Sequence, residues 1–204
     1  MTTPKGTAAK ARLLDATIQL MRRGGLAGTG VNEIVAASGA PKGSVYHFFP
    51  DGKRQIAVEA LARYGASVHA AMDEALTRAR GPRAKVRALF ALLERRLVDA
   101  EYGASCAVGA VTLDLDESLA GVRPATAAAF ADWRALFAAH FPIRDRRRRE
   151  AFAGLLLTAI QGGYVRGRAE RSAEPFREAA RWLGDIAEHE TFAPDDASSE
   201  RAPE

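Results

Sequence analysis

The sequence predicts an all-α protein. Apolar residues recur at helical spacing along most of its 204 residues, as at Leu14, Ile18 and Met21. No stretch alternates apolar and polar residues with the β-branched enrichment that is typical of strands. Glycines and prolines interrupt the periodic segments, and they mark where one helix ends and the next begins.

The first helices are short. A helix through Met21 ends at the pair Gly24-Gly25, and a second helix over residues 31–38 ends at Gly39. Pro41 suits the first turn of a third helix, through Phe48, because its φ angle is already set. Two helices of about two turns each bury little apolar surface by themselves, so we expect a helix-turn-helix that leans on its neighbours.

Longer helices follow. A turn at residues 50–52 precedes a long helix over residues 54–79, and Gly81-Pro82 ends it. Residues 103–109 are read as a loop or a broken helix around Cys106. The further helices are expected over residues 83–100, 125–141 and 150–168 and around Phe176–Ile186. The small polar residues of the acidic tail, 190–204, predict disorder.

Composition excludes several classes of protein. A chain that is 48% hydrophobic can bury a core, and its single cysteine cannot close an intramolecular disulfide. Four scattered histidines have no metal-ligand spacing, so we expect no metal and no cofactor. The polar, basic N-terminus and the lack of a run of about 20 apolar residues predict a cytoplasmic protein with no membrane partner.

The positive charge is unevenly distributed. Residues 1–54 hold eight basic and three acidic residues, a net charge of +5, whereas the remaining 21 basic and 22 acidic residues sum to −1. The first quarter of the chain therefore suits a polyanionic partner such as nucleic acid.

The second helix of the expected helix-turn-helix carries the chemistry for DNA. Its first half has Lys42, Gly43 and Ser44, which provide a cation, room for close backbone approach and a short hydroxyl in a major groove. Its second half has Tyr46 and His47, whose polar tips suit phosphate oxygens. After the next turn, Lys53 stands at a helix N-terminus, which already attracts anions.

These residues carry a resemblance to a known family. The run from Gly43 to Pro50 with Lys53 behind it resembles the DNA-binding domain of the tetracycline-repressor (TetR) family. Thr29-Gly-Val-Asn32, Ala40-Pro-Lys-Gly-Ser44 and Pro50-Asp-Gly-Lys53 are similar to its LmrA/YxaF-like branch.

The resemblance implies a transcriptional repressor rather than an enzyme. It implies an N-terminal DNA-binding domain of three helices over residues 6–66, with the helix-turn-helix at about 30–49, and an effector-binding and dimerisation domain over 67–189. It also implies a homodimer on a double-stranded DNA operator, released by a small-molecule effector. Gly30 replaces the hydroxyl residue of most relatives, so Thr29 or Asn32 is expected to contact phosphate or cap the helix. The implied DNA-binding residues are Thr29, Asn32, Lys42, Gly43, Ser44, Tyr46, His47 and Lys53.

The effector and dimer residues are less clearly indicated, because aromatic residues at helical spacing also build an ordinary core. Gln161 and Arg166 are candidates for orienting a polar group of a ligand. The candidate pocket residues are Cys106, Phe130, Trp133, Phe137, Phe152, Leu156, Gln161 and Tyr164. Small residues suit a seam between the last two long helices of two subunits, and the candidate dimer residues are Ala159, Gly162, Gly163, Phe176 and Leu183.

Two rival functions stay open. One is a helical DNA-binding protein without effector control, and the other is an all-α carrier or enzyme, for which no nucleophile, paired acid and base, or phosphate loop is found. The basic run over residues 144–149 is interpreted as a solvent-exposed charged surface rather than a second nucleic-acid site. Glu188 or the acidic tail are the candidate partners of its arginines.

Overall fold

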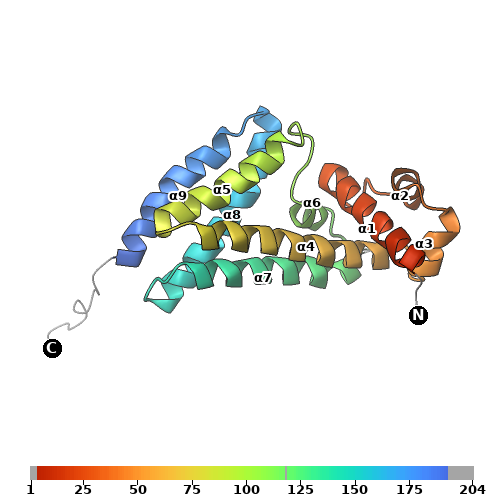
Figure 1. Cartoon of the computed structure of the whole chain (residues 1–204), viewed down its shortest axis with the longest axis horizontal. Helices are drawn as coiled ribbons and strands as arrows, with labels where there is room; N and C mark the ends of the chain where they lie inside the picture. Colours follow the sequence, from red (N-terminus) through yellow and green to blue (C-terminus); the bar gives the residue numbers. More distant parts are fainter. Residues whose placement is uncertain (1–3, 118, 193–204) are drawn as a thin grey trace.

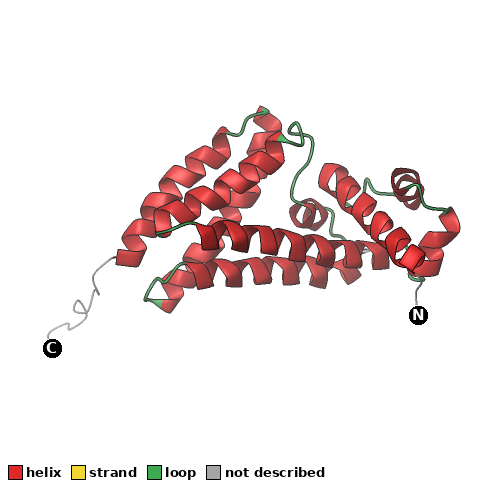
Figure 2. Ribbon diagram, in the orientation of Figure 1, coloured by secondary structure: helices red, strands yellow, loops and turns green. Residues whose placement is uncertain are grey.

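The computed structural model describes residues 4–117 and 119–192, and throughout this part of the chain the regular structure is helical (Figures 1 and 2). A short 3₁₀ turn, η1 (Ala120–Val122), accompanies the α-helices. In chain order these are α1 (Pro4–Gly24), α2 (Val31–Ser38), α3 (Lys42–Phe48), α4 (Lys53–Arg78), α5 (Pro82–Val98), α6 (Ala107–Leu113), α7 (Arg123–His140), α8 (Arg146–Glu170) and α9 (Glu174–Phe192).

The N-terminal domain packs α1, α2 and α3 around the start of α4. Met21 of α1, Ile34 of α2 and Val45 of α3 are fully buried, and Phe49 fills the corner after α3. The apolar stripes read from the sequence therefore meet in one small core, which fixes α3 with its other face toward solvent.

The long helix α4 is shared by both halves of the molecule (Figure 1). Its first turns lie beside α1, and its later turns pack against α5 and α7. In the C-terminal part, α9 lies along α5 and α8, while α7 lies between α4 and α8. The buried indole Nε1 of Trp133 donates to the carbonyl of Gly65 at 3.1 Å, so α7 holds the middle of α4 directly.

Some element boundaries differ from the sequence-based expectation. α6 occupies residues assigned in part to a loop, since Val108 and Val111 are buried on one side of a short helix. α8 begins at Arg146 rather than at residue 150, because the Asp145 carboxylate caps it by accepting from the Arg148 amide at 2.7 Å. α9 extends to Phe192, three residues into the expected tail, whose remainder lies outside the described residues.

None of the described helices is long and apolar enough to cross a membrane.

Candidate nucleic-acid interface and ligand groove

The turn between α2 and α3 depends on two residues. Gly39 has a left-handed backbone with φ of 62°, and its amide donates to the carbonyl of Val35 at 3.1 Å, which ends α2. Pro41 then precedes α3, and its carbonyl accepts from the Ser44 amide at 2.9 Å. This tight connection leaves α2 and α3 as a helix-turn-helix.

The predicted base-contacting and phosphate-contacting residues of α3 lie on its solvent side. Lys42, Gly43 and His47 are exposed, and Tyr46 keeps 56% of its surface. Ser44 is half-buried. Val45 and Phe49 anchor the opposite face of the helix. The solvent face therefore presents the Lys42 ammonium, the backbone at Gly43 and the rings of Tyr46 and His47.

Lys53 opens α4 close to α3. It is half-buried, and Gly52 precedes it with φ of 62°, so the chain turns sharply before the helix starts. The first amides of α4 and the Lys53 ammonium together form an anion-attracting end. Neighbouring cations are already paired: Arg54 with Asp51 at 3.4 Å, and Lys10 with Glu59 at 2.7 Å.

The expectations for Thr29 and the start of α2 need correction. Thr29 is fully buried and its hydroxyl donates to the carbonyl of Gly25 at 2.6 Å, so it does not lie on the exposed face. No side chain caps α2 from Gly30, and Asn32 is exposed without that role. Instead the Glu33 carboxylate folds back over Gly30.

Not all of the N-terminal positive charge faces the same way. Arg22 and Arg23 end α1 on the side of α6, away from α3 (Figure 1). Ser105 donates its amide to the carbonyl of Arg22 at 2.7 Å, and Arg22 Nε returns a bond to the carbonyl of Ser105 at 3.2 Å. This pair of arginines belongs to the junction between the two halves of the chain.

Most of the candidate pocket residues are packed in the core. Their side chains contact one another, as in the ring pairs Phe141–Phe152 and Tyr164–Phe176. Burial also raises the pKa of the Cys106 thiol, which Gln161 and Tyr64 flank. The residues placed in this core are Cys106, Trp133, Phe137, Phe152, Leu156 and Tyr164.

The other two candidates, Phe130 and Gln161, line a groove of about 760 Å³. This junction groove lies among the end of α1, α6, α7 and α8. Its walls include residues that sequence reasoning did not select, among them Leu113 and Arg168. Leu113 is 83% exposed, and its position beside the groove depends on helices that are distant in sequence.

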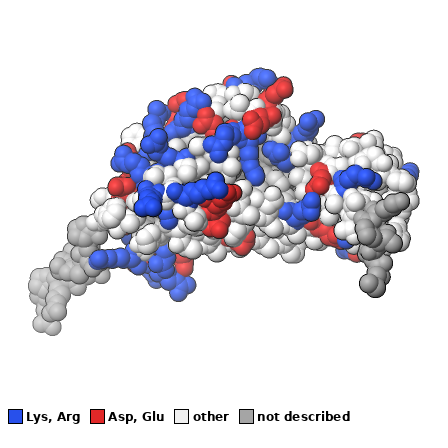
Figure 3. All heavy atoms as spheres, in the orientation of Figure 1, with Lys and Arg blue, Asp and Glu red and all other residues white. Residues whose placement is uncertain are grey.

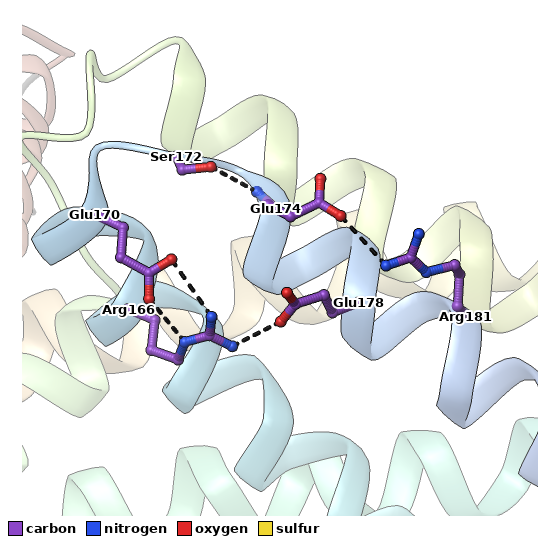
Figure 4. Close-up of polar contacts among 6 residues, drawn as sticks. All are labelled: Arg166, Glu170, Ser172, Glu174, Glu178 and Arg181. Carbon is purple, nitrogen blue, oxygen red and sulfur yellow. Dashed lines mark hydrogen bonds and ion pairs between the residues drawn. The ribbon is translucent and has the colours of Figure 1, made fainter.

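Arg166 is not available to a ligand in this structure. Its guanidinium bonds Glu170 on α8 at 2.8 Å and Glu178 on α9 at 2.7 Å (Figure 4). On the same surface Glu174 receives a bond from Arg181 at 3.3 Å. These exposed ion pairs fasten the corner between α8 and α9.

Three of the candidate dimer residues pack inside one subunit. A Cβ on Gly163 would stand 2.4 Å from Cε1 of Phe176, so the glycine permits close approach of α8 and α9 of the same chain. Phe176 is fully buried and Leu183 is 6% exposed. Ala159 is half-buried, and Gly162 is exposed with open space around it.

A different apolar surface lies open on these helices. Small and apolar residues on α8 are exposed at spacings of four and three, as on a helix that packs against another helix. On α9, Trp182 is 71% and Ile186 is 38% exposed. We call the α8 residues the α8 stripe: Ala151, Leu155, Thr158, Gly162, Val165 and Ala169.

The basic run at 144–149 pairs with one of the expected partners, since Glu190 is the first residue of the expected acidic tail. Arg148 forms two bonds to the Glu190 carboxylate, at 2.7 and 2.6 Å, and Arg146 pairs with Glu150 at 2.8 Å. Elsewhere on the visible face, Lys and Arg crowd over α5 and α9 with Asp and Glu among them (Figure 3). Interleaved charge of this kind is typical of a solvated surface.

Comparison with known proteins agrees with this architecture. Residues 13–60 match the bacterial regulatory proteins of the tetR family, and residues 82–182 match the C-terminal domain of LmrA/YxaF-like transcriptional regulators. The chain is 29% identical over 183 residues to the HTH-type transcriptional regulator Rv0196 of Mycobacterium tuberculosis, covering 86% of this chain and 92% of that protein. It is 24% identical to LmrA of Bacillus subtilis, covering 86% and 94%.

Solved structures share the fold. A TetR regulatory protein from Rhodobacter sphaeroides superposes with a TM-score of 0.78 at 22% identity, covering 87% of this chain and 97% of that one. The TetR-family regulator CifR, solved as a cysteine mutant with 26-bp operator DNA, superposes with a TM-score of 0.73 at 20% identity, covering 86% and 94%. With both domains matched, the chain belongs to the TetR family, as a transcriptional regulator whose helix-turn-helix DNA-binding domain precedes an LmrA/YxaF-like C-terminal domain.

Proposed function

We propose that this regulator is a repressor that binds a pseudo-palindromic operator as a homodimer and leaves it when a small lipophilic effector binds. The observation that carries the DNA part is the solvent face of α3. Lys42, Gly43 and Ser44 stand at the end that enters the major groove, and Tyr46 and His47 stand where the helix meets the backbone. Lys53 adds a phosphate contact from α4.

The homodimer is supported by the α8 stripe and Trp182. A large exposed indole beside a row of small residues is unusual on a monomer surface and suits a four-helix seam with a second copy. A twofold axis through this seam leaves both copies of α3 at the far end of the molecule. To enter successive major grooves they must stand about 34–36 Å apart.

Release by an effector is supported by the connections between the domains. α4 runs through both, and it contacts α1 in the N-terminal domain and α5 and α7 in the C-terminal domain. The bonds between Arg22 and Ser105 tie the end of α1 to the segment before α6. A ligand that moves α6 or tilts α4 therefore changes the spacing of the two α3 helices and lowers the population that fits the operator.

The test is selection of DNA by the purified full chain from a random pool, followed by sequencing. We expect an inverted repeat whose half-sites are separated by about one or more helical turns, with affinity that falls steeply as salt rises. Retardation that is independent of sequence and present only at low salt indicates a constitutive DNA-binding protein. Absence of DNA binding favours a carrier or enzyme.

The dimer is tested separately by sedimentation. Leu155→Arg and Trp182→Glu place charge on the proposed seam, and both are expected to yield monomers that bind a single half-site weakly. Arg87→Glu, an exposed change on α5, is the matched control and keeps the dimer. Dimers in all three variants contradict a seam built on α8 and α9.

A further inference from the structure

Phe49 joins α3 to α4. Its ring is fully buried, its amide donates to the carbonyl of Val45 at 2.8 Å, and its carbonyl accepts from the Gly52 amide at 2.8 Å. The first part of α1, α3 and the start of α4 meet at this end of the molecule (Figure 1). The side chains that hold Phe49 therefore set the orientation of α3, and with it the direction in which Lys42 and Tyr46 face solvent.

A cation of α1 lies against the Phe49 ring. The ammonium of Lys10 stands 5.2 Å from the centroid of this ring and 2.7 Å from Oε2 of Glu59 on α4. The face of an aromatic ring attracts a cation, because its π-system is negative there. Lys10 therefore bridges the ring behind α3 and a carboxylate of α4.

The second oxygen of the same carboxylate orders the turn before α4. Oε1 of Glu59 accepts from Nε2 of Gln55 at 2.9 Å, and Oε1 of Gln55 accepts from the Asp51 amide at 3.2 Å. An ionised carboxylate only accepts hydrogen bonds, so Gln55 must turn its NH₂ group toward Glu59 and its oxygen toward the turn. The charge on Glu59 thus fixes the direction of both bonds.

Glu59 is ionised in this arrangement. Burial raises the pKa of its carboxyl, but the hydrogen bonds from Lys10 and Gln55 and the charge of Lys10 outweigh burial and hold the pKa below its usual value. Each carboxylate oxygen serves one of these two donors. A neutral side chain of the same shape would lose the charge-assisted part of both bonds.

We infer that Glu59 is a positioning residue for operator recognition, whose carboxylate sets the angle of α3. It acts through Lys10, which it holds against Phe49, and through Gln55, which it holds against the turn before α4. Lys10 serves this arrangement rather than a DNA phosphate. The inference rests on the proposed function, since it names a residue that aligns the recognition surface without touching DNA. A misaligned α3 keeps its positive charge but loses base contacts, so only the sequence-specific part of DNA binding should weaken.

The experiment follows binding of the full chain to two labelled duplexes by fluorescence anisotropy over a salt series. One duplex is the operator selected from the random pool, and the other is a scrambled sequence of the same length. Glu59→Gln replaces the carboxylate by an amide of the same shape. We expect it to bind operator about tenfold more weakly, roughly the effect of one lost base contact, and to bind the scrambled duplex unchanged.

Lys10→Met separates positioning from a phosphate contact. The substitution keeps the length of the side chain and removes its charge. Operator affinity should fall as in Glu59→Gln, whereas the slope of log affinity against log salt concentration should stay unchanged, because no phosphate contact is lost. A slope lowered by about one with unchanged discrimination between the duplexes would make Lys10 a phosphate contact and overturns the inference.

Two further variants test whether any ion pair at this place is sufficient. Lys10→Arg retains a cation that can lie on the ring and bond the carboxylate, so discrimination should be kept. The exchanged pair, Lys10→Glu with Glu59→Lys, restores opposite charges but places an anion against the face of the Phe49 ring. It also places a donor against the NH₂ group of Gln55, which cannot accept and also satisfy the Asp51 amide. Discrimination should therefore stay low in the exchanged pair.

The matched control is another ion pair between α1 and α4. Arg63 bonds Asp15 at 2.8 and 3.3 Å, one helical turn further along α4 from Glu59 and further from the turn that precedes the helix. Asp15→Asn should leave both the discrimination and the salt slope unchanged. Circular dichroism verifies that each variant is folded.

Three more results overturn the inference. They are unchanged discrimination in folded Glu59→Gln, full discrimination in the exchanged pair, and an equal loss in Asp15→Asn. A failure of the proposed function is seen separately, in an unsubstituted chain that binds the selected and scrambled duplexes equally. Amide hydrogen exchange of the DNA-free chain then still decides the role of Glu59: Glu59→Gln should exchange several-fold faster over residues 49–52, and an unchanged rate overturns the inference.

Discussion

Arg22 and Ser105 exchange two hydrogen bonds across the boundary between the domains. The Ser105 amide donates to the Arg22 carbonyl at 2.7 Å, and Arg22 Nε donates to the Ser105 carbonyl at 3.2 Å. The first bond satisfies a carbonyl in the last turn of α1, which has no partner within the helix. Arg22, in the last turn of α1, thus holds the helix to the segment that leads into α6.

Arg22→Ala removes the side-chain half of this contact. We expect the free energy of unfolding to fall by about 1 kcal/mol, because the Ser105 carbonyl loses its donor. Denaturant titration followed by circular dichroism measures it. Arg23→Ala changes an exposed neighbour whose side chain takes no part in the contact between Arg22 and Ser105, and it should change stability by less than about 0.5 kcal/mol. Equal effects of the two substitutions contradict a specific role for Arg22.

Lys42 and Lys53 are expected to differ in how they affect DNA binding. Lys42→Ala should alter the preferred base at one position of each half-site, at a cost of about 1–3 kcal/mol if it reads guanine. Lys53→Ala should weaken binding to all DNA sequences by the same factor. It should also reduce the slope of log affinity against log salt concentration by about one. Binding to the selected operator and to single-base variants over a salt series separates the two roles. A shared pattern for both variants contradicts the assignment.

Gly163 is expected to tolerate no side chain. In Gly163→Ala the new Cβ overlaps the buried Phe176 ring, so the free energy of unfolding should fall by about 1–3 kcal/mol. Gly154→Ala is the matched control on the same helix, since nothing lies within 4 Å of its added Cβ. That change should raise stability by up to about 1 kcal/mol through helix propensity. Thermal melts at one protein concentration compare them, and a neutral Gly163→Ala contradicts the contact.

Cys106 is expected to be unreactive in the folded protein. It is 3% exposed, and burial raises the pKa of its thiol, so little thiolate is available. A disulfide reagent such as Ellman's reagent should modify it only after unfolding in guanidinium chloride. Rapid modification of the native chain at pH 8 would show that the thiol is accessible and would contradict its burial.

The Arg148–Glu190 pair predicts a defined pH dependence. The hydrogen bond from Arg148 holds the pKa of the Glu190 carboxyl below its usual value, so the pair stabilises the fold above pH 4.5 and loses its effect as the pH falls through the folded pKa. Glu190→Gln should lower the free energy of unfolding at pH 7 by no more than about 1 kcal/mol. A slightly lower melting temperature would report this loss. The difference should vanish in acid, and a difference that persists there contradicts the pair.

The sequence by itself determined the helical class, the helix-turn-helix and its exposed chemistry. These features depend on local rules: apolar spacing, a glycine with a left-handed backbone at residue 39, and a proline before a helix. The solvent face of α3 follows from the inward-facing Val45 and Phe48, although the structure buries Phe49, just after the helix, more deeply than Phe48. Lys42, Tyr46 and His47 were therefore predictable as exposed.

Only the tertiary structure decided which apolar residues form a core and which border a cavity or a free surface. Periodicity indicates that Phe152, Leu156 and Gln161 belong to one helix, but their surroundings depend on helices far away in sequence. Gly163 and Phe176 were both expected between subunits, yet they contact each other within one subunit. Thr29 turned inward to the carbonyl of Gly25. Burial is a property of packed neighbours, and spacing along the chain does not specify them.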